Sequence, residues 1–268
     1  MPTEASVARD LLYYSGARDS GFDRITEADD AAEVHLREVQ NAIRAANESS
    51  DNALFLAGVM NRLLRKADGK STAGRWTASA VDSVRSALLY ASAGLDVSLK
   101  RLVRHALPML PDIDSRVEVR FQKWAEVKMQ GTNGSIDAQA LIRVLMTKGE
   151  SPRDSLMTAW VADLTAGSAQ SAQRVAEIAQ ALGVTDPSIM KRVQPGKSSR
   201  TVLEGAFEAR NLIAHELDVI DPDAEVRKRL ENIRQYRGHD EIAAWCVELL
   251  DLTQLIANNV AKRLDAAV

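Results

Sequence analysis

Residues 210–215, with the sequence RNLIAH, hold the side chains of this chain that are best suited to chemistry. Arg210 provides a fixed cation, Asn211 an amide and His215 a titratable imidazole, all within about one and a half turns of a helix. A guanidinium can hold a phosphodiester through its fork of donors, and an imidazole can exchange a proton near neutral pH. The run therefore predicts a site that binds a phosphodiester and moves protons on it.

The spacing of these three residues constrains where such a site can form. Asn211 and His215 are four residues apart and share one face of a helix. Arg210 lies five residues before His215, about 140° round an ideal helix, so the two side chains do not point together. A swing of the long arginine, a facing helix or a second protomer must close this angle. We therefore expect the site to be built at an interface.

RNA is the phosphodiester that suits these groups, because its 2′-hydroxyl lies next to the scissile phosphate and can attack it. A neutral His215 could accept the hydroxyl proton, and Arg210 could hold the non-bridging oxygens as negative charge builds. Asn211 could orient either partner. Such cleavage needs no metal and leaves a 2′,3′-cyclic phosphate. The alternative interpretation is structural, with His215 capping helix carbonyls and Arg210 joined to Glu208 in a surface network.

The other motifs in the chain do not support a nucleotide-dependent or metal-dependent enzyme. The two Gly-Lys-Ser triplets, at Gly69 and Gly196, lack the glycine that a phosphate-binding loop carries five residues earlier. His215 and Glu216 begin like a zinc-protease helix, but Val219 stands where the second imidazole would be. We therefore predict no metal ligands and no cofactor.

A basic segment precedes the run. Between residues 187 and 203 the chain has four basic residues and no acidic one, namely Lys191, Arg192, Lys197 and Arg200. The segment is either a solvated loop or a surface that contacts RNA phosphates, and its position just before residues 210–215 keeps both interpretations open. It could also serve a nucleic-acid-binding regulator, although the chain shows neither a helix-turn-helix nor a strongly basic balance.

The composition indicates a helical protein with an aliphatic core. Of the 268 residues, 46% are apolar but only 4% are aromatic, and the formal net charge is −3. This charge excludes a generic polyanion binder but leaves room for a local basic groove. Cys246, the single cysteine, lies in an apolar stretch and is predicted to be a buried thiol. No signal segment or membrane-spanning run is recognisable, so we expect a cytoplasmic protein without membrane contact.

Mostly apolar residues recur at steps of three and four along two long stretches. They are Val84, Leu88, Ala91, Leu95, Leu99 and Leu102 in the first, and Ile242, Trp245, Cys246, Leu249, Thr253, Ile256 and Val260 in the second. The spacing predicts long helices there, and Ser151-Pro152 and Asp221-Pro222 predict further helix starts. Breaks fall at 67–75, 131–135, 167–168 and 194–199. With no convincing strand, the predicted fold class is an all-α multi-helix bundle.

The segment after Lys66, rich in Gly, Ser and Thr, is the best domain boundary in the chain. We predict residues 1–70 as an N-terminal helical extension or subdomain, and residues 76–268 as the main helical domain. The first part either stands alone or packs on the rest.

The run Arg-Asn-x-x-Ala-His, placed before the last long helix of an all-α chain, resembles the signature of the HEPN superfamily. That signature is Arg-x4-6-His with a polar residue just after the arginine, and Arg210, Asn211 and His215 match it. The helix predicted over 81–104, with Asp96 among small and apolar residues, resembles the first helix of the family's bundle, where an acidic residue is common. The resemblance covers roughly residues 76–268.

The resemblance implies a bundle of HEPN type, homodimerisation that brings two Arg–His sets into a composite site, and metal-independent endoribonuclease activity on RNA. In this interpretation Arg210, Asn211 and His215 are catalytic, Asp96 is a supporting acid, and the basic segment binds RNA. Family members act as toxins or antiviral defence effectors, so an antitoxin or regulatory protein is a further expected partner. The alternative is a non-catalytic HEPN-like module that binds a protein or a nucleotide.

Overall fold

The computed structural model describes residues 36–71, 76–130, 137–146, 149, 151–194, 200–220 and 233–266. Within these ranges every named element is a helix, and an isolated bridge joins Val219 to Arg234. The predicted all-α multi-helix fold is therefore confirmed. In the same ranges, no helix has the length and apolar character required to cross a membrane.

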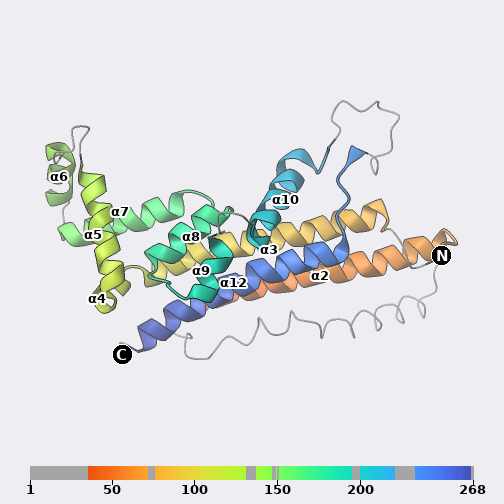
Figure 1. Ribbon diagram of the computed structural model, residues 1–268, viewed down its shortest axis with the longest axis horizontal. Helices are drawn as coiled ribbons and strands as arrows, with labels where there is room; N and C mark the ends of the chain where they lie inside the picture. The colour runs from red at the N-terminus through yellow and green to blue at the C-terminus, as the bar shows by residue number, and fades with distance from the viewer. Residues whose placement is uncertain are drawn as a thin grey trace.

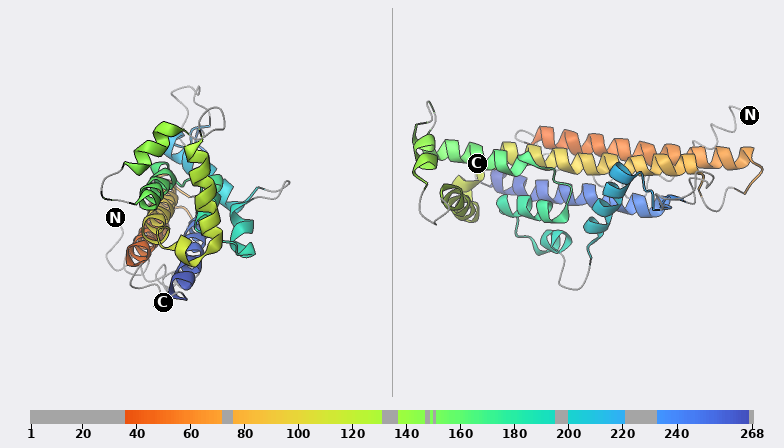
Figure 2. Two further views of the ribbon diagram at one scale, coloured as in Figure 1. Left: turned by 90° about the vertical axis from the view of Figure 1, so that its left-hand side faces the viewer. Right: turned by 90° about the horizontal axis from the view of Figure 1, so that it is seen from above.

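Three long helices lie side by side and form the frame of the molecule (Figures 1 and 2). They are α2 (Arg37–Ala67), α3 (Ala78–Ala106) and α12 (His239–Asp265). A short connection makes α2 antiparallel to α3. The helix α12 runs parallel to α3, since the rings of Trp76 and His239 stack 4.7 Å apart at one end of the pair and Arg263 Nη1 donates to Asp114 Oδ2 at the other.

The predicted apolar stripes form the core of this frame. In α3 all six residues of the stripe are fully buried, and in α12 every predicted position is buried except Trp245, which is partly exposed. Cys246 is buried, as predicted. A Cβ built on Gly94 of α3 would overlap the Cβ of Ala46 on α2, so the two backbones approach closely where these residues meet.

The helix α2 belongs to the same core as the rest of the chain. Val39, Ile43 and Leu54 of α2 are buried in one apolar cluster with residues of α3 and α12. Residues 36–67 therefore pack on the main helical domain, and the boundary predicted after Lys66 falls at the connection between α2 and α3. The remainder of the predicted extension, residues 1–35, lies outside the described residues.

Seven shorter helices complete the part of the fold that the structure describes: α4 (Leu110–Ile113), α5 (Ser115–Met129), α6 (Ala138–Leu145), α7 (Pro152–Ala166), α8 (Ala172–Ala181), α9 (Pro187–Val193) and α10 (Val202–Glu216). The helices α4, α5 and α6 gather beyond the C-terminal end of α3, and α10 packs against α3, α8, α9 and α12 (Figure 1). Ser151 caps α7 by accepting the backbone N–H of Asp154 at 3.1 Å, as predicted. The helix start predicted at Asp221-Pro222 lies outside the described residues.

Candidate functional site

The helix α10 carries the run RNLIAH on its last two turns. It begins with a capping box, in which Thr201 Oγ1 accepts the Glu204 N–H at 3.1 Å and Glu204 Oε2 accepts the Thr201 N–H at 2.8 Å. Its core-facing residues are Leu203, Ala206, Phe207, Ala209 and Ile213. This burial fixes the rotation of α10, so its polar residues face outward.

The three candidate catalytic residues differ in exposure. Asn211 and His215 are exposed, and Arg210 is partly buried. Arg210 Nη1 donates to Asn211 Oδ1 at 3.0 Å, so the guanidinium turns toward its neighbour. Arg210 Nε is buried and has no hydrogen-bond partner in the described part of the chain. Such an unsatisfied donor costs about 1–3 kcal/mol and calls for an explanation.

A groove of about 540 Å³ lies between α10 and the start of α8. Asn211 and His215 both line it, in keeping with their four-residue spacing, whereas Arg210 is not among its described lining residues. The opposite wall is formed by Gln170 and the first residues of α8. Ser171 Oγ caps α8 by accepting the backbone N–H of Arg174 at 3.2 Å, and the positive dipole end of the helix favours an anion on this wall.

Asp96 holds that opposite wall from outside the groove. Its Oδ1 accepts the backbone N–H of Ala169 at 2.6 Å, and its Oδ2 accepts Lys100 Nζ at 2.9 Å. Ala169 is fully buried and directly precedes Gln170, the first lining residue of the loop. The acid expected to support catalysis is thus placed where it supports the α7–α8 loop.

Three glutamates also line the groove: Glu204, Glu208 and Glu216. Glu204 is held in the capping box and Glu208 forms an ion pair with Arg200. The Arg200 guanidinium neutralises the charge of Glu208, which would otherwise oppose an anionic ligand.

The structure does not gather the basic segment into one patch. Arg192 Nε donates to Glu248 Oε1 at 2.8 Å and its Nη1 donates to Asp251 Oδ2 at 2.7 Å, so it ties α9 to α12. Burial opposes its charge, but these bonds outweigh that effect and raise the pKa of Arg192. Lys191 is exposed, and Lys197 lies outside the described residues.

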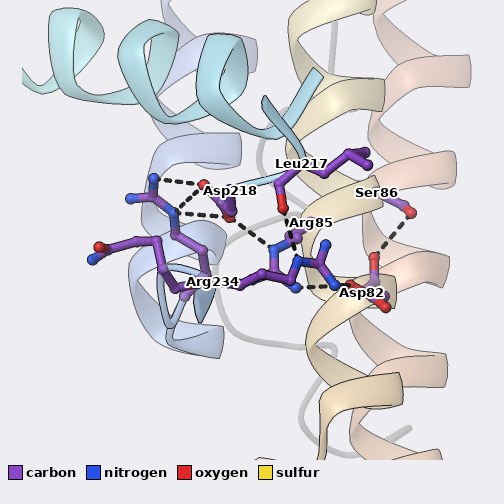
Figure 3. Close-up of polar contacts among 8 residues, drawn as sticks. Asp82, Arg85, Ser86, Leu217, Asp218 and Arg234 are labelled. Atoms are coloured by element: carbon purple, nitrogen blue, oxygen red, sulfur yellow. Dashed lines mark hydrogen bonds and ion pairs between the residues drawn. The ribbon is translucent and has the colours of Figure 1, made fainter. Parts of the chain in front are cut away.

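A buried ion network at the end of α10 was missed by the sequence analysis (Figure 3). Asp218 Oδ2 accepts Arg85 Nε at 2.8 Å, and Asp218 Oδ1 accepts Arg237 Nη2 at 2.9 Å. All three side chains are buried. The sequence did contain one signal for this network. Arg85 directly follows Val84 of the apolar stripe, and a charged side chain beside a buried stripe needs a partner of opposite charge.

The described residues were also considered for metal binding, and the chain was compared with known proteins. Among the described residues, no group of three or more His, Cys, Asp or Glu side chains is placed to hold a metal ion. Comparison with protein-family models, curated proteins and solved structures finds no match.

Proposed function

We propose that this protein is a metal-independent endoribonuclease with a HEPN-like active site on α10. The observation that carries the proposal is the placement of Asn211 and His215 in one groove, with Arg210 hydrogen-bonded to Asn211. A cation, an amide and an imidazole thus lie within two turns of one helix, opposite a wall that favours an anion.

In the proposed reaction His215 first acts as a general base. It takes the proton of the ribose 2′-hydroxyl, and the resulting oxygen attacks phosphorus while the bond to the 5′-oxygen breaks. The departing 5′-oxygen takes its proton from the His215 imidazolium formed in the first transfer or from water, and the other product is a 2′,3′-cyclic phosphate. Arg210 stabilises the charge that builds on the non-bridging oxygens, and Asn211 holds its guanidinium in place.

A homodimer would complete this site. His215 lines the groove while Arg210 does not, so a second protomer would bring its own Arg210 to the groove of the first. Exposed Leu217 and Ile220 just after α10 offer apolar surface for such an association. The biological setting that follows is a cytoplasmic toxin or antiviral effector, controlled by an antitoxin or another regulatory protein.

A non-catalytic HEPN-like module is the second candidate, and a specific observation favours it. Glu216 lines the same groove as His215, and its carboxylate would repel the phosphates of RNA. A basic segment of a protein partner would fit this wall better than a nucleotide. The two candidates differ in whether RNA is cut at all.

The test is cleavage of a mixed RNA substrate in the presence of EDTA, with product ends analysed for 2′,3′-cyclic phosphate. We expect His215→Ala to lower the rate by about 10²–10⁴-fold, the usual contribution of a general acid or base. The matched control is His105→Ala, since His105 is an exposed histidine on α3 paired with Glu38. Cleavage that requires magnesium, or that survives His215→Ala unchanged, would reject the nuclease in favour of the binding module.

The composite site has its own test by complementation. Arg210→Ala and His215→Ala proteins are each expected to be inactive, but a mixture allowed to exchange subunits would form heterodimers. If each site takes one residue from each protomer, half of the sites in a heterodimer are intact, and about a quarter of the parent activity returns when half of the dimers are mixed. A site contained within one protomer would show no recovery.

A further inference from the structure

The C-terminal end of α10 has a backbone that its own sequence does not favour. Leu217 and Asp218 both adopt the left-handed conformation, with φ of 51° and 59°, where glycine is the usual residue. The Asp218 N–H bonds back to Leu212 O at 3.0 Å and closes the helix. A non-glycine residue is strained in this region, so other interactions must hold the turn.

The Asp218 carboxylate supplies that hold. Its side chain is completely buried, and Arg85 from α3 and Arg237 from the segment before α12 approach it from two sides. A carboxylate flanked by two guanidinium groups is fully paired, so its burial is tolerated only while both contacts exist. The ion triad therefore joins the end of α10 to two distant parts of the chain.

Backbone contacts extend the same connection. Arg85 Nη2 donates to Gln235 O at 2.7 Å, and Arg234 Nε donates to Leu217 O at 2.7 Å. The Gln235 N–H donates to Asp218 O at 2.7 Å. The side chain of Asp218, its own carbonyl and the carbonyl of Leu217 are thus all held by the same cluster of residues (Figure 3).

We infer that Asp218 is a positioning residue for His215. The imidazole is carried by the last turn of α10, three residues before Asp218, and the other end of α10 is fixed by the capping box. If the triad is lost, the strained turn relaxes and the last turn of the helix frays, which displaces His215 from the groove. The catalytic consequence rests on the proposed ribonuclease function, whereas the structural consequence for His215 does not.

Asp82 provides a matched control within the same network. Its Oδ1 accepts Arg85 Nη1 at 2.7 Å and lies 3.0 Å from Arg234 Nη1, but its side chain is half exposed and does not touch the turn. Asp82→Asn removes one carboxylate from Arg85, as Asp218→Asn does. Only the second substitution loosens the end of α10.

The experiment compares Asp218→Asn, Asp82→Asn and parent by two measurements. The imidazole NMR signals of His215, assigned with His215→Ala, report its position whether or not RNA is cleaved. Steady-state cleavage then separates kcat from KM. A stability control is Gly183→Ala, which strains a left-handed glycine (φ 73°) beyond the C-terminal end of α8, where the added Cβ would meet Val117 and Arg263.

For Asp218→Asn we expect shifted or broadened His215 signals and a kcat about 10- to 100-fold lower, with KM changed less than threefold. Asp82→Asn and Gly183→Ala should keep the parent signals and kcat. Parent-like His215 signals in folded Asp218→Asn protein would overturn the inference, and so would equal losses in all three variants. If Asp218→Asn does not fold, the same measurements are made on Arg237→Lys, and the same outcomes apply. This variant keeps the positive charge but lacks the planar guanidinium that bonds both oxygens of Asp218. If no protein cleaves RNA, the proposed function fails and the His215 signals alone judge the role of Asp218.

Discussion

The carboxylate of Asp96 on α3 accepts the backbone N–H of Ala169 at 2.6 Å, although the two residues are 73 positions apart in the chain. Ala169 has no exposed surface, so water cannot replace this acceptor. The bond fixes the loop that leads into α8, and that loop is one wall of the groove that holds Asn211 and His215. Asp96 thus connects the frame of the bundle to the candidate site.

We predict that Asp96→Ala lowers the free energy of unfolding by about 1–3 kcal/mol, because it leaves a buried N–H without an acceptor. In a cleavage assay KM should rise more than kcat falls, since the substitution moves a binding wall and leaves His215 in place. Asp96→Asn keeps an acceptor oxygen, so its free energy of unfolding should fall clearly less than that of Asp96→Ala. Lys100→Met removes the ion pair alone and should cost at most about 1 kcal/mol. Urea denaturation of Asp96→Ala that matches the parent would refute this account.

The difference between what could and could not be predicted follows from the range of the contacts. The stripe from Val84 to Leu102 obeys helical periodicity, which is local, and it is buried as predicted. Arg192 and Lys191 are neighbours of equal charge in the sequence, but only the position of α12 decides that the first meets Glu248. Asp218 bonds to Arg85, which is 133 residues away in the chain, and no local sequence pattern predicts that pairing.

The close approach of α2 and α3 gives a prediction about packing. Gly94→Ala places a methyl group on the Cβ of Ala46, and overpacking of a tight core costs about 1–3 kcal/mol or more. We expect a clear fall in Tm, measured by circular dichroism. The double variant Ala46→Gly with Gly94→Ala exchanges the two side chains and restores the space. It should recover most of the loss, and a double variant as unstable as Gly94→Ala alone would contradict the packing argument.

The neighbours Lys191 and Arg192 give a prediction that separates RNA contact from helix packing. Arg192→Gln removes two ion pairs between α9 and α12, so the free energy of unfolding should fall by about 1–2 kcal/mol while RNA affinity stays near that of the parent. Lys191→Gln should leave stability unchanged, weaken RNA binding and lower its salt dependence by about one phosphate contact. Fluorescence anisotropy over a range of salt concentrations measures the RNA affinity and its salt dependence. Equal RNA affinity for Lys191→Gln and parent would remove Lys191 from the binding surface.

Acid stability provides a prediction centred on Asp114, the N-cap of α5. Hydrogen bonds from Arg116, and then from Arg263, outweigh the burial of the carboxylate and lower the pKa of Asp114 from 3.8 to about 2. Because the pKa is lower in the folded state, the stabilisation of up to about 2 kcal/mol is present above pH 4 and is lost as the pH falls toward 2. Asp114→Asn keeps a capping side chain but removes the charge.

The comparison of parent and Asp114→Asn protein isolates this carboxylate from the others. Arg153 also lowers the pKa of Glu118, so the parent alone would show the sum of several acid-sensitive groups. In the difference between parent and variant those other groups cancel. Urea denaturation should show the largest difference at pH 6 and a much smaller one near pH 2. A difference that stays constant over this range would mean that the carboxylate acts through its shape and packing, and that its charge adds nothing to the junction of α5 with α12.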